Sequence, residues 1–205
     1  MDTLDPDTTP ADVLTFWFGA YPLDAAAMVR VQGQWFRKDE AFDARLRERF
    51  GPAIAAARAG RLDAWAEQAE GRLALTVLLD QFTRNAFRGR PESFGGDAQA
   101  LALALEGIAR GHDQAVPPMA RPFCYLPLEH CEDGEMQARS VALFEALATS
   151  PGAQPAPLFA ANLDYARRHQ DVIRRFGRFP HRNAILGRAD TPDEAAYLAQ
   201  PGAGF

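Results

Sequence analysis

The stretch from Arg72 to Arg88 constrains the fold of this 205-residue chain more than any other. Its first half, residues 73–79, is almost wholly apolar, a pattern typical of a helix surrounded by other helices. Asp80, Arg84 and Arg88 then follow at intervals of four residues, so they share one face if the helix continues. The sequence therefore predicts a central helix that carries a charged row into the core or to its rim.

Length and composition indicate a single globular domain over residues 1–205. The chain is 47% hydrophobic, which is enough for a sizeable core at this length. Its acidic start has neither the basic nor the apolar region of a signal peptide, and the apolar run at 73–79 is far too short to span a membrane. We therefore expect a cytoplasmic protein in which Cys124 and Cys131 stay as thiols.

The charge pattern argues against nucleic acid as a partner. The formal net charge is −5, and the arginines are interspersed with acids. A nucleic-acid-binding surface would need a basic stripe or interleaved aromatic side chains, and neither occurs.

Helical patterns fill the chain from end to end, which predicts an all-α fold. Thr9 with Asp12, and Thr191 with Glu194, each combine an N-cap, a following proline and an acid at the third helical position. No stretch alternates polar and apolar residues over the length of a strand.

The same patterns predict several element boundaries and the core-facing side of one helix. Residues 19–29 are predicted to form a loop, and residues 123–126 are predicted to be extended or irregular. A helix should begin at Pro127 and reach about Thr149. In the helix that follows Asp97, the leucines at 101 and 105 should face the core.

A second polar segment, residues 126–133, contains three acids within one helical turn. Glu129, Glu132 and Asp133 would repel one another on a helix. Either the positive end of the helix dipole offsets this repulsion, or cations from another segment converge on it. The third polar segment, residues 176–183, supplies such cations, although its arginines could equally cap the preceding helix.

We predict that the charged row at residues 80–88 and the polar segments at 126–133 and 176–183 meet in one site. The candidates for proton transfer are Glu129, His130 and His181. His169 lies on an apolar stripe, where a core histidine is the favoured interpretation. The candidate ligand-binding residues are Asp80, Arg84, Asn85, Arg88, Glu132, Asp133, His169, Arg178, Arg182 and Asn183.

Three motifs resemble the signatures of a widespread bacterial family known as a domain of unknown function. They are LLDQFTRNAFRG, FCYLPLEHCED with Gln137 following, and HQDVIRRFGRFPHRNAILGR with TPDE after it. The likeness covers residues 11–198 and implies an α-α superhelix of about eight helices that resembles tetratricopeptide repeat proteins. Thr83 stands where the family usually has proline and Cys131 where serine is common, and neither departure removes a charged site residue.

Standard catalytic motifs are missing, so function rests on the polar residues. The chain has no phosphate-binding loop, nucleophile elbow, zinc-protease motif or dinucleotide fingerprint. Spacing leaves open a metal site built from His130, Glu132, His169 and His181, but neighbouring arginines would repel a cation. We therefore predict neither metal nor cofactor.

Three hypotheses about function remain open. The first is a binding protein whose arginines and His181 hold a small anionic molecule or a peptide carboxylate. The second is a hydrolase-like enzyme that uses the same site for general acid and base chemistry. The third is a structural ion network in a protein-interaction scaffold.

Overall fold

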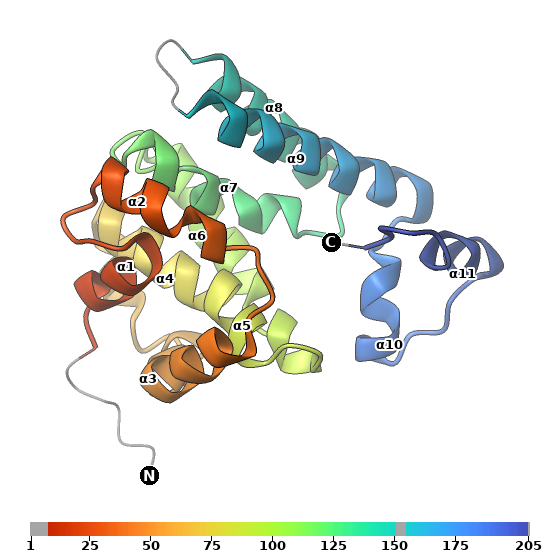
Figure 1. The fold of residues 1–205 in the computed structure, drawn as a ribbon, viewed down its shortest axis with the longest axis horizontal. Helices are drawn as coiled ribbons and strands as arrows, with labels where there is room; N and C mark the ends of the chain where they lie inside the picture. Colours follow the sequence, from red (N-terminus) through yellow and green to blue (C-terminus); the bar gives the residue numbers. More distant parts are fainter. Residues whose placement is uncertain (1–7, 151–154, 205) are drawn as a thin grey trace. The chain divides into compact units, whose positions relative to one another are not determined.

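The structure, a computed structural model, describes residues 8–150 and 155–204, and every regular element in these ranges is helical (Figure 1). The all-α prediction is confirmed. The chain divides into two compact units, one made of residues 1–88 and 92–127 and the other of residues 89–91 and 128–205. That these units form a single domain stays a prediction. Among the described helices, none is both long and apolar enough to cross a bilayer.

The first unit is built around α4, which contacts α1, α6 and the turn that follows it. Its helices are α1 (Pro10–Phe18), α2 (Ala25–Val31), α3 (Glu40–Arg58), α4 (Ala69–Val77), α5 (Thr83–Ala86), α6 (Asp97–Ala109) and most of α7 (Pro122–Glu129). Short 3-10 turns lie at Gln32–Gln34, Asp63–Glu67, Pro91–Phe94 and Pro118–Ala120.

The central helix predicted from the apolar run is confirmed, with one irregularity. Every residue from 71 to 83 is buried, and between α4 and α5 the backbone forms a π-helical turn, Leu78–Phe82. Such turns often mark functional sites, because the extra residue reorients the side chains that follow. Phe82 packs against the rings of Phe16, Trp17 and Phe50 at centroid distances of 5.8, 5.6 and 5.0 Å.

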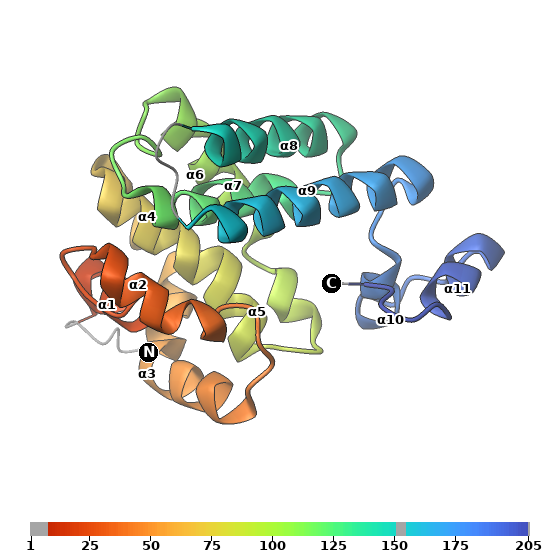
Figure 2. The same ribbon diagram turned by 45° about the horizontal axis from the view of Figure 1, so that its top comes forward.

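The second unit is built on α8 (Gly134–Thr149) and α9 (Ala156–Phe176), which lie side by side in Figures 1 and 2. It continues through a 3-10 turn, Pro180–Arg182, into α10 (Asn183–Leu186) and α11 (Pro192–Leu198). Gly177 ends α9 with a φ of 69°, a backbone conformation that favours glycine. Phe179 is fully buried against Val172 and Ile173 of α9.

The predicted boundaries near the acidic segment are wrong. Residues 123–126 are helical, because α7 begins at Pro122, where a missing N–H costs nothing. The expected single helix from Pro127 to Thr149 is two helices, since α7 ends at Glu129 and α8 begins at Gly134. Asp133 caps α8, accepting hydrogen bonds of 2.9 Å from the backbone N–H groups of residues 135 and 136.

Two further expectations, for a loop and for a core-facing helix surface, need correction. The loop over residues 19–29 is shorter than predicted, because Asp24 caps α2. On α6 the buried residues are Ala100, Ala104 and Gly107, while the leucines at 101 and 105 are only half-buried. At Gly107 the buried side chain of Arg72 takes up the space that a larger residue would need: a Cβ there would lie 2.7 Å from Cδ of Arg72. Both predicted capping boxes, at Thr9 and Thr191, are present.

Candidate functional site

The charged row of the central helix begins with an ion pair inside the first unit. Arg84 meets Asp97 with both nitrogens of its fork, at 2.8 and 3.1 Å, and its Nη1 also lies 3.0 Å from Oδ1 of Asp80. Burial alone would lower the pKa of Arg84, but the charges of Asp80 and Asp97 outweigh it and raise the pKa. Gln81 donates a hydrogen bond to the Asp80 carboxylate. Arg84 therefore already holds two carboxylates.

Asn85 and Arg88, which follow Arg84 in the chain, both contact Asp43 of α3. Asn85 donates to Oδ1 of Asp43 over 2.7 Å, and Nε of Arg88 lies 2.8 Å from its Oδ2. Sequence reasoning missed Asp43 as a partner, because it sits on an ordinary amphipathic helix. The sequence also predicted Asp97 only as an N-cap, but Gly96 holds that position and Asp97 is the first residue of α6. Asp43 is 4% exposed and the side chain of Arg88 is 39% exposed, so this cluster lies where the interior of the unit meets its surface.

The second and third polar segments meet in the second unit, as their opposite charges predict. Glu132 accepts a 2.8 Å hydrogen bond from the backbone N–H of Phe179 and is gripped by both Nη atoms of Arg188, at 2.7 and 2.9 Å. Burial would raise the pKa of Glu132, but Arg188 and the backbone donor lower it. Arg182 donates to the carbonyl of His130 over 2.9 Å. Of the three acids, Glu132 is thus paired with a cation, Arg188, which lies outside the third polar segment, and Asp133 is a helix cap.

Arg178 and Glu194 form a second bidentate pair in this unit. Nε and Nη2 of Arg178 lie 2.6 and 2.7 Å from the two carboxylate oxygens of Glu194, which is 2% exposed. Hydrogen bonds from Arg178 and from the backbone of Thr191 lower the pKa of Glu194 to about 2. Asn183 donates to Asp190 over 2.7 Å. The sequence marked Glu194 only as a capping acid, so its partnership with Arg178 was missed.

His169 is a buried, neutral histidine. Its Nδ1 lies 2.9 Å from the carbonyl oxygen of Tyr165 and 3.1 Å from Oε1 of Glu129, and this geometry places a proton on that nitrogen. Burial, followed by repulsion from His130, lowers the pKa of His169 to about 2. The favoured reading of His169 as a core histidine agrees with this environment.

The remaining candidate residues lie around the ring of Phe179. Its ring centroid lies 5.5 Å from that of His169 and 5.6 Å from that of His181, and the guanidinium carbon of Arg182 is 4.6 Å above it. The rings of His130 and His169 are 6.3 Å apart. The cluster is therefore packed around an apolar ring. No group of three or more potential metal ligands is arranged for binding within the described part of the chain.

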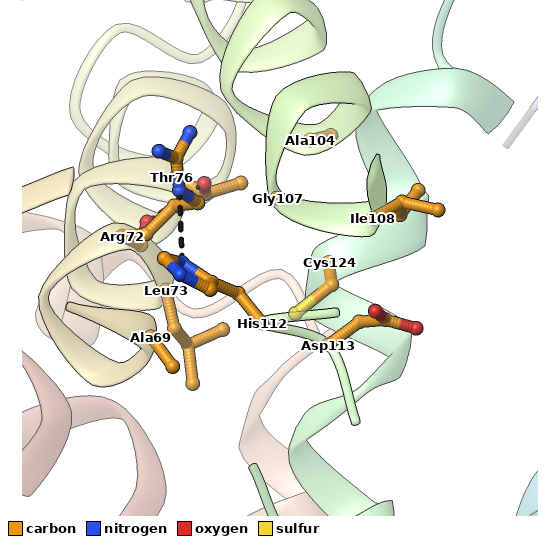
Figure 3. A pocket seen from close by; sticks show the side chains of 10 residues that line it. All are labelled: Ala69, Arg72, Leu73, Thr76, Ala104, Gly107, Ile108, His112, Asp113 and Cys124. Carbon is orange, nitrogen blue, oxygen red and sulfur yellow. Dashed lines mark hydrogen bonds between the residues drawn. The ribbon is translucent and has the colours of Figure 1, made fainter. Parts of the chain in front are cut away.

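A small cavity in the first unit lies between α4, α6 and α7 (Figure 3). Its volume is about 10 Å³, which is room for roughly one water molecule. Nε of Arg72 donates to Nδ1 of His112 over 3.2 Å at its edge. Burial raises the pKa of the Cys124 thiol to about 12, so this cysteine is a poor nucleophile. The cavity suits an internal water better than a ligand.

A larger groove, of about 210 Å³, lies in the second unit between α9 and α11. Arg168, Asp171, Val172 and Arg175 of α9 form one wall, and Tyr197 with residues 200–203 forms the other. Sequence reasoning singled out neither arginine. The only signal was their spacing of seven residues, which puts both on one face of a helix.

Fold and site together define a class of protein: an all-helical chain in which Arg84, Arg178 and Arg188 are paired with carboxylates, and whose second unit carries an arginine-lined groove. The chain matches the family described as "Bacterial protein of unknown function (DUF924)" over residues 13–202, and it belongs to that family.

A solved structure and the curated proteins complete the comparison. The structure of ATU0120, a protein of unknown function from Agrobacterium tumefaciens, is similar with a TM-score of 0.79 and 43% identity, covering 94% of this chain and 97% of that one. None of the curated proteins is significantly similar to this chain.

Proposed function

We propose that this protein binds a small anionic ligand in the groove between α9 and α11, with Arg175 as the principal contact. The carrying observation is the position of Arg175. Its guanidinium carbon lies 4.7 Å from the ring centroid of Phe176 and 5.4 Å from that of Tyr197, and it makes no hydrogen bond or ion pair with any described residue. The two rings hold the cation while leaving its N–H donors for a carboxylate or a phosphate.

The arginines first expected to bind the ligand are less suited to it. Arg84 is paired with Asp80, which is 1% exposed, and Arg178 with Glu194, which is 2% exposed, so an incoming anion would have to displace a buried charge. Breaking such a pair strands the carboxylate and costs about 3–5 kcal/mol when the pair is fully buried. Their geometry supports the hypothesis of a structural ion network for these residues.

The proposal contains no catalytic step. Of the three candidates for proton transfer, Glu129 is only 3% exposed, and the half-buried His130 and His181 are not among the residues that line the groove. A residue that transfers protons to a substrate must be able to reach it. We also propose that the chain forms the helical superhelix that the family resemblance implies. The packing of α8 against α9 supports this.

Thermal melting tests the proposal directly. Wild type, Arg175→Gln and Arg167→Gln are melted with carboxylates and inorganic phosphate, at an ionic strength matched with sodium chloride. Arg167→Gln is the control because it makes the same charge change beside the groove's Arg168, while its own partner is Glu145, 3.0 Å away on the surface. A ligand at 100 times its Kd adds about 2.7 kcal/mol, which is roughly 5–10 °C in Tm for a chain of this size.

We expect wild type and Arg167→Gln to share the rise in Tm and Arg175→Gln to lose it. Equal rises in all three proteins would place the binding elsewhere. The absence of a rise with every anion would refute the proposed function.

A further inference from the structure

Asp171 lines the same groove as Arg175 and lies on the same face of α9. The two residues are four apart in the chain, so their side chains leave the helix about 6 Å apart along its axis. An acid four residues before an arginine is the order that favours an ion pair on a helix. Among the described residues, however, no ion pair or hydrogen bond joins these two. One wall of the groove therefore presents a carboxylate and a guanidinium that are not paired with each other.

The surroundings of each group leave its hydrogen-bonding capacity to a ligand. The guanidinium of Arg175 lies against the rings of Phe176 and Tyr197, which accept none of its N–H donors in their planes. The side chain of Asp171 is 68% exposed, and its ion-pair partner Arg174 is 3.7 Å away, too far for a hydrogen bond. A ligand can thus receive donors from one residue and offer donors to the other.

The opposite wall of the groove carries no charged side chain. It consists of Tyr197, Gln200, Pro201, Gly202 and Ala203. On α9, Val172 adds an apolar surface, and Arg168, whose guanidinium carbon lies 4.9 Å from the ring centroid of Tyr165, is assigned no ligand contact. A further charge on the ligand would lose water against this wall without gaining a partner, so an uncharged group suits it best.

We infer that the groove binds an amino acid with an uncharged side chain, whose carboxylate is held by Arg175 and whose ammonium group is held by Asp171. Both ligand groups are attached to one carbon atom, so a single small molecule can reach two side chains on one helical face. The inference rests on the proposed function, because Arg175 still binds the anionic group, and it names the class of ligand. The groove volume of about 210 Å³ lies below the roughly 300–1,000 Å³ of drug-sized sites, which agrees with a small metabolite.

Isothermal titration calorimetry tests this inference with ligands that differ by one group. The probes are alanine, valine and leucine. Each is compared with the carboxylate that lacks its amino group, with the amine that lacks its carboxylate, and with its N-acetyl derivative, which has no ammonium charge. At least one amino acid should bind wild type at least about threefold tighter than its carboxylate and its amine, because it forms two charge pairs instead of one. Its N-acetyl derivative should bind no tighter than the carboxylate.

Asp171→Asn distinguishes an amino acid from a simple anion by the sign of its effect. The substitution should remove at least about the same factor from amino-acid binding, yet leave carboxylate binding unchanged or tighter, because it deletes a charge that repels an anion. Asp164→Asn is the matched control, since Asp164 is exposed on the same helix and does not line the groove. Arg175→Gln should weaken both ligands, and Arg167→Gln should weaken neither. All four side chains are exposed, so circular dichroism should show wild-type helix content in each variant.

The outcomes separate the two proposals. If carboxylates bind as tightly as the amino acids and Arg175→Gln weakens them, the inference is wrong while the proposed function stands. Amino-acid binding that is as tight in Asp171→Asn as in wild type would also overturn the inference alone. If no amino acid, carboxylate or phosphate binds to wild type, both are wrong.

Discussion

At the scale of single residues, arginine has two roles in this chain, which differ in what faces the guanidinium. Arg84, Arg178 and Arg188 each grip a carboxylate with two nitrogens, and such forks combine charge with fixed geometry. Arg175 instead lies on aromatic rings. We propose that the first group stabilises the fold and that Arg175 binds the ligand.

The pair of Arg178 and Glu194 predicts a pH dependence of stability. Glu194 has a pKa of about 2 in the folded chain and an ordinary value of 4.5. As the pH falls, the unfolded chain takes up this proton first, so the stabilisation is complete above about pH 4.5 and is lost as the pH approaches 2. Replacing Glu194 by Gln should therefore destabilise the protein at neutral pH, and the difference from wild type should shrink through this window.

Urea unfolding of wild type and Glu194→Gln at a series of pH values measures that difference. Glu145→Gln is the control, since Glu145 and its partner Arg167 are both more than half exposed and such pairs contribute roughly 0–1 kcal/mol. A Glu194→Gln difference that stays constant from neutral pH to pH 3 would mean that the ion pair is not its source.

At the scale of elements, glycines set how closely the helices of the first unit approach. A Cβ on Gly71 would lie 2.2 Å from the carbonyl oxygen of Trp65, so the 3-10 turn Asp63–Glu67 lies against the first turn of α4 where no side chain would fit. A Cβ on Gly96, just before α6, would lie 2.2 Å from the carbonyl oxygen of Leu79 in the π-helical turn. The position of α6, and with it the Arg84–Asp97 pair, depends on that close contact.

Two glycine-to-alanine substitutions should have opposite effects. Gly96→Ala forces a side chain against backbone and should destabilise the protein by about 1–3 kcal/mol or more. Gly51→Ala, inside α3 with no atom within 4 Å of the added Cβ, should stabilise it by about 0.5–1 kcal/mol, because alanine loses less backbone freedom on folding. Urea unfolding measures both, and a neutral Gly96→Ala would contradict the close contact.

At the scale of the whole molecule, the open matter is whether the two units unfold together. The boundary falls inside α7, between Pro127 and Leu128, so one helix contributes to both units. All three tryptophans, Trp17, Trp35 and Trp65, belong to the first unit. Tryptophan fluorescence therefore reports on the first unit, while far-UV circular dichroism reports on the helices of both.

The predicted single domain should give coincident unfolding curves by the two methods. In urea, fluorescence and circular dichroism should share one midpoint, because probes of a cooperative two-state transition agree. A circular dichroism curve with a second step that fluorescence lacks would show that the second unit unfolds independently.

The sequence by itself determined the class of fold and many of its boundaries. Local interactions, which the order of side chains specifies directly, explain the capping boxes at Thr9 and Thr191. The apolar run at residues 73–79 likewise specifies the buried central helix. Where a boundary depended on several prolines close together, as around Pro122 and Pro127, the same local rules allowed more than one helix start, and the predicted one was wrong.

Only the tertiary structure decided which charge meets which. Asp43 holds Asn85 and Arg88 from more than forty residues away, and Glu194 was known only as a cap until Arg178 was seen to grip it. The spacing of charges along a chain is a property of one helix, whereas an ion pair between distant residues exists only after packing has brought their helices together. The groove has the same origin, because the face shared by Arg168 and Arg175 becomes a groove wall only where Tyr197 and the residues after α11 lie across from it.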